Sequence, residues 1–255
     1  MNIWNTFFIE PLYNALLFLV NIFPGANLAL AIIALTIVVK LLLLPLSRKS
    51  IINQIHQKRL QPYVQKIREQ YTDKQEQAQK LMAFYKANKT NPFSGCLLLV
   101  LQMPIILALY QTFLRGVGTA DTALYAGITI PENLQTVFAG GLIDLAAPSI
   151  ALAIATGLVQ LLQVRLSPTF KESEEEKQKA KKKMSDMTDP SEMQAAMMQK
   201  VQKGMRYFVP VMITVFAMIV PSAVALYWMV NNFFTILQEM ILAKRLNNLV
   251  VVEAE

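Results

Sequence analysis

Long apolar segments alternate with charged segments along the chain, and this pattern predicts an all-α membrane protein. A helix needs roughly 20 apolar residues to cross the hydrocarbon core of a bilayer. We expect five transmembrane helices, over residues 27–46, 92–114, 147–164, 207–220 and 221–242. The fourth has only 14 residues, which make about 21 Å of helix. Because this is shorter than the hydrocarbon core, we expect protein to cover its ends or the bilayer to thin around it.

The N-terminal segment, residues 1–26, is apolar but too short to span. Its apolar run, residues 12–23, is interrupted by Asn14 and Asn21. The pattern predicts an amphipathic helix over residues 3–23 that lies in the membrane interface on the extracytoplasmic side. A signal peptide is the alternative, and it is disfavoured because no basic region precedes the run and no small-residue cleavage site follows it.

The distribution of Lys and Arg predicts the orientation. Ten lie in residues 47–91 and ten in residues 165–206, whereas residues 115–146 hold only Arg115 and residues 1–26 hold none. Because positively charged loops stay in the cytoplasm, we expect the N-terminus outside and the C-terminus in the cytoplasm. Residues 115–146 would then form an extracytoplasmic loop, and residues 243–255 a cytoplasmic tail.

Residues 47–91 predict a basic cytoplasmic helical hairpin. Apolar residues repeat at helical spacing up to Tyr71, and Asp73 with Glu76 has the pattern of a helix N-terminus. Ten basic and three acidic residues give this segment a charge of +7. Two interpretations stay open: a solvated hairpin that packs only on itself, or a docking surface for anionic lipid, RNA or incoming polypeptide.

Residues 165–206 predict a second, charged cytoplasmic loop. Its ten basic residues face seven acidic ones, so we expect a charged helix or a solvated segment without specific chemistry.

Lys40 is the one cation expected inside a span. A Lys at the centre of a span costs about 2.5–3.5 kcal/mol on insertion scales. Its long stem could carry the ammonium to the cytoplasmic headgroups, or the ammonium could face a water-filled cavity. The only acidic residue in any predicted span is Glu239, near the cytoplasmic end of the fifth. With no acid at the depth of Lys40 in the first four spans, a hydrated cavity is the favoured interpretation.

Other polar side chains could line such a cavity. Thr36 is one helical turn from Lys40, and Gln102 lies in the middle of the second span. Asn231 and Asn232 lie on the fifth span. Each of them could equally form a hydrogen bond between helices that carries no function.

Composition and motifs exclude several classes of protein. Hydrophobic residues make up 54% of the chain and charged residues 16%, against about 25% charged in soluble domains. One Cys and one His allow neither a disulfide within the chain nor a His-rich metal site. The sequence has no HExxH, GxSxG or phosphate-binding loop and no paired intramembrane Asp. We therefore expect no enzyme, metal or cofactor, and no ATP hydrolysis.

Two ordered sets of motifs stand out along the chain. The first is Asn91-Pro92, Gln102-Met103-Pro104-Ile105 and Ala108-Leu109-Tyr110, and the second is Pro221-Ser222 with Leu226-Tyr227-Trp228. Together they resemble the YidC-type membrane insertase family, which includes mitochondrial Oxa and chloroplast Albino relatives. The resemblance covers residues 4–242. It implies an interfacial helix, five core spans and a cytoplasmic hairpin. It also implies insertion and folding of membrane proteins through a cytoplasm-open hydrophilic groove, alone or beside the Sec translocon.

The resemblance also implies which residues act. Lys40 stands where the family commonly has an Arg facing the groove, so the charge is kept but the planar five-donor fork is lost. The expected groove residues are Lys40, Thr36, Gln102, Trp228, Asn231 and Asn232. The expected lipid-facing contacts for a substrate helix are Met103, Ile106, Thr214 and Phe216.

The resemblance implies nascent membrane proteins as partners. The cytoplasmic loops would meet the Sec translocon, the ribosome or the signal recognition particle receptor, and anionic lipids, with no specific nucleic-acid sequence. We expect the short form without a large extracytoplasmic domain, in a bacterial plasma membrane, with residues 170–188 as an insertion. A small-anion transporter and a non-inserting assembly scaffold are the alternatives.

Overall fold

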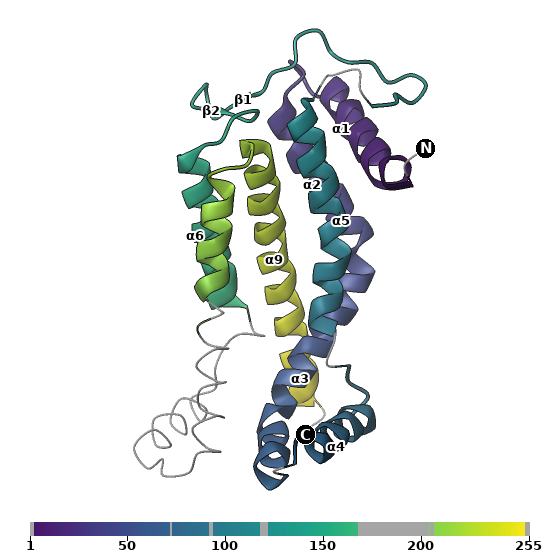
Figure 1. The fold of residues 1–255 in the computed structure, drawn as a ribbon, viewed down its shortest axis with the longest axis vertical. Helices are drawn as coiled ribbons and strands as arrows, with labels where there is room; N and C mark the ends of the chain where they lie inside the picture. Colours follow the sequence, from purple (N-terminus) through teal and green to yellow (C-terminus); the bar gives the residue numbers. More distant parts are fainter. Residues whose placement is uncertain are drawn as a thin grey trace.

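The computed structural model describes residues 3–71, 73–91, 94–117, 122–167, 204 and 207–252. Its described part is an elongated helical bundle (Figure 1), and the predicted all-α class is confirmed. The helices are η1 (Asn5–Ile9), α1 (Glu10–Ile22), α2 (Leu28–Leu42), α3 (Leu44–Gln70), α4 (Lys74–Ala87), α5 (Ser94–Arg115), α6 (Ile150–Leu166), an unlabelled helix Tyr207–Ala217, and α9 (Ser222–Val252). One small antiparallel ribbon pairs β1 (Val137–Phe138) with β2 (Ile143–Asp144).

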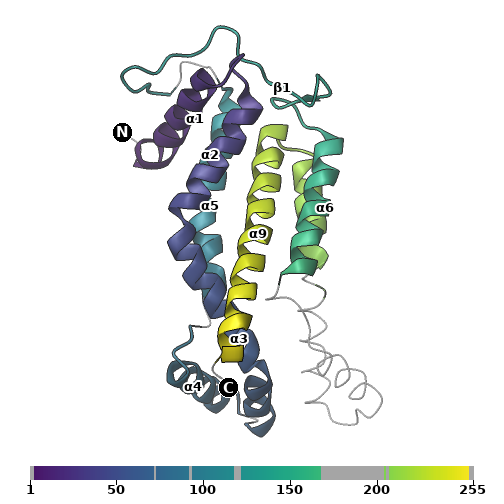
Figure 2. The ribbon, with the colours of Figure 1, turned by 180° about the vertical axis from the view of Figure 1, so that it is seen from behind.

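Helix α9 is the centre of the bundle. It contacts α2, α3, α5 and α6, and it runs beside α6 in both views of the ribbon (Figures 1 and 2). Helix α1 and the β ribbon lie at one end of the bundle, whereas α3 and α4 lie at the other, together with the C-terminal end of α9 (Figure 1). We call these the ribbon end and the hairpin end.

Polar side chains define where several helices begin. The Asn27 side chain accepts a hydrogen bond from the Leu30 amide at 3.1 Å and caps α2. Asp73 accepts from the Gln75 amide at 3.0 Å and caps α4. These side chains satisfy amides that have no partner within the first helical turn.

The structure divides the predicted span 27–46 between two helices. Helix α2 ends at Leu42, and α3 begins at Leu44, with Pro45 in its first turn. Proline has no amide hydrogen and is tolerated there, but it ends the hydrogen-bond ladder of a preceding helix. Residues 44–46 therefore belong to the helix of the hairpin end.

Within the described residues, α2 and residues 44–68 of α3 are long and apolar enough to cross a membrane only as a pair, bent by 66°, and no single helix meets both conditions. The five predicted spans stay a prediction.

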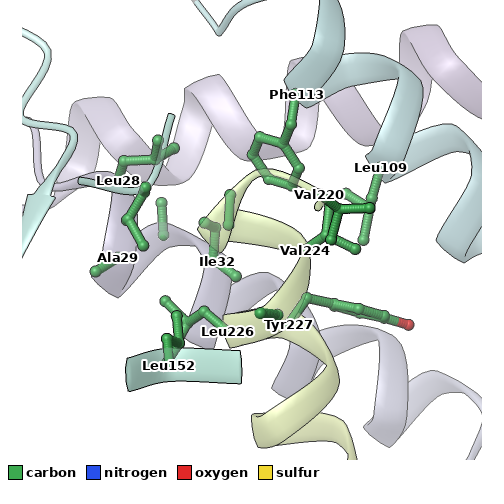
Figure 3. Close-up of a cluster of buried hydrophobic side chains, with 14 of the residues drawn as sticks. Leu28, Ala29, Ile32, Leu109, Phe113, Leu152, Val220, Val224, Leu226 and Tyr227 are labelled. Atoms are coloured by element: carbon green, nitrogen blue, oxygen red, sulfur yellow. The ribbon is translucent and has the colours of Figure 1, made fainter. Parts of the chain in front are cut away.

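The ribbon end is filled by an apolar core. Figure 3 shows side chains from α2, α5, α6 and α9 meeting there. The labelled members are Leu28, Ala29, Ile32, Leu109, Phe113, Leu152, Val220, Val224, Leu226 and Tyr227. Leu16 and Val20 of α1 join the same cluster with no exposed surface, so one face of the predicted interfacial helix packs on the bundle. The Tyr227 hydroxyl points out of the cluster (Figure 3).

The connection into α9 closes the ribbon end. The Ser222 amide and hydroxyl both donate to the Ala147 carbonyl, at 3.0 and 2.6 Å, and the Ala223 amide donates to the Leu145 carbonyl at 3.0 Å. At its other end α9 continues through Leu242 to Val252, so most of the predicted tail, residues 243–255, extends this helix.

Candidate functional site

Lys40 lies on α2 and reaches across to α9. Its ammonium donates a hydrogen bond to Thr235 Oγ1 at 2.9 Å, and the Thr235 hydroxyl donates in turn to the Asn231 carbonyl at 2.8 Å. Because α2 and α9 both run from the ribbon end toward the hairpin end (Figure 1), the two side chains meet at a similar height in the bundle. The Lys40 side chain is half-buried.

Gln102 connects α5 to the same stretch of α9. Its amide nitrogen contacts the Tyr227 hydroxyl and lies 3.3 Å from Asn231 Oδ1. The Gln102 amide thus engages residues one helical turn apart on α9. The predicted groove residues Lys40, Gln102 and Asn231 therefore converge on one face of α9.

Asn232 points to another neighbour, α6. Its amide donates to Gln160 Oε1 at 2.6 Å, and the Gln160 amide donates to Gln163 Oε1 at 3.0 Å. Asn232 is 4% exposed. Successive residues on a helix are about 100° apart, so Asn231 and Asn232 serve different interfaces.

The polar contacts continue toward the hairpin end. The Gln238 amide donates to Ser47 Oγ at 2.6 Å and joins α9 to α3. Glu239 is 6% exposed and shares a hydrogen bond with the Ser167 hydroxyl at the end of α6. Sequence reasoning did not pair Glu239 with Lys40, but the structure brings them into electrostatic interaction.

Along α9, the buried side chains are therefore apolar near the ribbon end and include several polar ones toward the hairpin end. On α9, residues 223–227 are 0–2% exposed and lie in the apolar core. Residues 231–239 instead send polar side chains to α2, α3, α5 and α6. We call this set the polar half; its members are Lys40, Ser47, Gln102, Gln160, Asn231, Asn232, Thr235, Gln238 and Glu239.

Two predicted groove residues, Thr36 and Trp228, are not members of the polar half. Thr36 is 1% exposed, and its hydroxyl donates to the Ile32 carbonyl of its own helix at 2.7 Å. The half-buried Trp228 ring meets Phe216 edge-on, with centroids 6.5 Å apart.

The predicted lipid-facing residues occupy different environments. Met103 is 49% exposed and Phe216 is 39% exposed, whereas Ile106 packs partly against the apolar core. Thr214 packs against α6: a Cβ atom placed on Gly157 would lie 1.9 Å from Thr214 Oγ1. Met103 and Phe216 are therefore exposed apolar side chains, whereas Thr214 lies at the contact between α6 and helix Tyr207–Ala217.

Sequence reasoning missed Ser47, Gln160 and Ser167. Gln160 and Gln163 were visible as two amides within an apolar segment, which is the signal that could have found them. Ser47 and Ser167 are each the short partner of a longer side chain on α9.

The described residues contain no group of three or more His, Cys, Asp or Glu side chains that could hold a metal ion. A separate pocket of about 680 Å³ lies at the ribbon end between Asn27 and residues 134–141. Its lining carries no charged side chain.

The family model described as 60Kd inner membrane protein matches residues 18–248. Over 246 residues, the chain is 34% identical to a protein named membrane protein insertase YidC from Actinobacillus pleuropneumoniae serotype 3 and covers 38% of it. It is 35% identical to a protein of that name from Haemophilus influenzae over 246 residues, again 38% of the relative. A third, from Oleidesulfovibrio alaskensis, is 34% identical over 239 residues. These alignments cover 92–95% of this chain, which spans about 38% of the length of the curated relatives.

Proposed function

Since the chain belongs to the 60Kd inner membrane protein family, with relatives named membrane protein insertase YidC, we propose that it inserts and folds membrane proteins in a bacterial inner membrane. The five predicted spans then cross the bilayer with the N-terminus outside and the C-terminus in the cytoplasm. The ribbon end faces outward and the hairpin end faces the cytoplasm, in line with the ten basic residues in each cytoplasmic segment.

The contrast between the two ends of the bundle is the observation that carries this proposal. An apolar core seals the ribbon end, and the polar half begins below Tyr227 and extends toward the hairpin end. Polar groups within a membrane are expensive unless they pair or meet water. A polar interior open only toward the cytoplasm gives a hydrophilic segment a route part of the way across.

Lys40 is the attracting charge in this mechanism. A short polar outer segment of a substrate enters from the cytoplasm, and its acidic side chains replace part of their hydration by interaction with the Lys40 ammonium. Thr235 orients that ammonium through the 2.9 Å hydrogen bond. Water in the polar half and a bilayer thinned by short helices lower the free energy of carrying the segment across.

The apolar part of the substrate stays in contact with lipid. Met103 on α5 and Phe216 on helix Tyr207–Ala217 are exposed apolar side chains, and they can contact a substrate helix while its polar end moves through the polar half. Ile106 and Thr214 support this surface from behind. No nucleotide-binding motif occurs in the sequence, so binding energy and the membrane potential drive the step without ATP.

The hairpin formed by α3 and α4 receives the partners. Its charge of +7 suits anionic lipid and acidic surfaces of the targeting machinery. We assign to it the encounter with the ribosome or the signal recognition particle receptor, and to the bundle a position beside the Sec translocon.

The test is insertion into proteoliposomes that contain the purified protein alone. The substrate is a single-span protein with a short acidic outer tail, and the readout is protection of that tail from added protease. We expect protection without ATP and none in protein-free liposomes. Equal protection in both would contradict the proposal. Failure to insert together with anion flux would favour the transporter, and failure of both would favour the scaffold.

A further inference from the structure

Glu239 is a buried acid that the mechanism above leaves without a role. It is the only Asp or Glu in the five predicted spans, and it is 6% exposed. Its Oε2 atom has no hydrogen-bond partner among the described residues. The Ser167 side chain forms a hydrogen bond with the carboxylate. A carboxylate can accept about four hydrogen bonds, so much of its acceptor capacity is unused.

The position of Glu239 relates it to Lys40. Thr235 precedes it by four residues, so the two side chains lie on the same face of α9. The Lys40 ammonium donates to Thr235, and Glu239 lies one helical turn further toward the hairpin end on that face. Lys40 and Glu239 interact electrostatically. An ammonium has three donors, and Thr235 takes one of them.

The geometry points to Glu239 as the built-in counter-ion of Lys40, which an acidic segment of a substrate displaces when it enters the polar half. This inference rests on the proposed function and specifies how the same site selects its substrate. A lone buried cation would collect any small anion, whereas a cation with an internal partner binds only a ligand that competes with that partner. A competing internal contact lowers the apparent affinity of the ligand.

Removing the Glu239 charge removes the competitor, so acidic segments bind more tightly while neutral segments bind as before. Glu239→Gln keeps the shape of the side chain and its contact with Ser167. Glu239→Asp keeps the charge. Glu76→Gln, on the exposed face of α4, is the matched control because it changes the net charge equally and lies outside the polar half.

The experiment measures binding of two fluorescent peptides to the detergent-purified full chain. The peptides are identical except that one carries Asp where the other carries Asn. We expect Glu239→Gln to tighten binding of the Asp peptide by roughly fivefold or more, within the range of coupled sites. The Asn peptide, and both peptides with Glu239→Asp or Glu76→Gln, should bind as to the unmodified chain.

Equal binding of the Asp peptide to the unmodified chain and to Glu239→Gln would overturn the inference, as would tightening of both peptides alike. Combining Glu239→Gln with Lys40→Gln should abolish the tighter binding of the Asp peptide. Tighter binding that survives this double change would also overturn the inference. Insertion of matched acidic-tailed and neutral-tailed substrates is measured in parallel. If binding follows the expectation but no variant inserts either substrate, the proposed function fails and the counter-ion role stands.

Discussion

Lys40 and Thr235, 195 positions apart in the sequence, are joined by a 2.9 Å hydrogen bond from the Lys40 ammonium to Thr235 Oγ1. The bond directs the charge toward the interior of the bundle and fixes α2 against α9. The interior position disfavours the simplest alternative, in which the long side chain only extends to the headgroups. The position of Thr235, which accepts this hydrogen bond, therefore shows where the Lys40 ammonium lies in the bundle.

The Thr235 hydroxyl can be removed without changing the shape of the side chain. Thr235→Val should destabilise the purified protein by about 1–3 kcal/mol, because a charged donor in the interior loses its acceptor. The melting temperature in detergent measures this. Thr235→Ser keeps the hydroxyl and should melt close to the unmodified protein. Equal losses for the two variants would show that the methyl group, and not the hydrogen bond, supports the contact.

Gly157 permits the close approach of α6 and helix Tyr207–Ala217. An added Cβ would lie 1.9 Å from Thr214 Oγ1 and 3.1 Å from Thr214 Cβ, so Gly157→Ala should cost about 1–3 kcal/mol through overpacking. The melting temperature again reports it. Gly157→Ala combined with Thr214→Ala should recover part of the loss, because the nearest atom is gone. No recovery would mean that the helices do not meet here.

Asn14 connects α1 to the segment that follows α5. Its amide donates to the Glu10 and Ala123 carbonyls at 2.8 and 2.9 Å, and its carbonyl accepts from the Tyr125 amide at 2.8 Å. Asn14→Leu should speed hydrogen exchange at the Tyr125 amide, since that donor loses its acceptor. Asn21→Leu, which removes only an exposed contact to the Thr129 carbonyl, is the control and should leave Tyr125 unchanged. Unchanged exchange in Asn14→Leu would contradict the contact.

The buried amide pair Asn232 and Gln160 offers a test of the α6–α9 interface. A double-mutant cycle with Asn232→Leu and Gln160→Leu should give a coupling energy of about 0.6–1.7 kcal/mol, as for side-chain hydrogen bonds between membrane helices. Unfolding in detergent measures each corner. Strict additivity of the two changes would exclude a direct bond between these side chains.

The apolar pattern predicted the positions of most helices, because burial requires long apolar stretches and these are visible in one dimension. It does not indicate helix boundaries that depend on a single residue. Residues 44–46 look like the end of a span, but Pro45 starts a new helix there. Beyond Leu242 the composition turns polar, yet α9 continues, since no Pro or Gly follows Pro221 to stop it.

The sequence predicted several residues of the candidate site, but it did not predict which residues they contact. Lys40, Gln102 and Asn231 stand out because each is polar within a largely apolar segment. The partners of these residues come from other helices at separations of 195 and 129 residues, and periodicity carries no information on which helices pack together. The roles of Thr235 and Glu239 therefore required the packing of α2 against α9.

The central claim is that the positive charge at position 40 attracts acidic segments of substrates, and a charge series at that position tests it most directly. In cells that depend on this protein, Lys40→Arg should sustain insertion of an acidic-tailed substrate, Lys40→Ala should weaken it, and Lys40→Glu should abolish it. A neutral-tailed version of the same substrate should depend much less on the change. Normal insertion of the acidic-tailed substrate by Lys40→Glu would contradict the account.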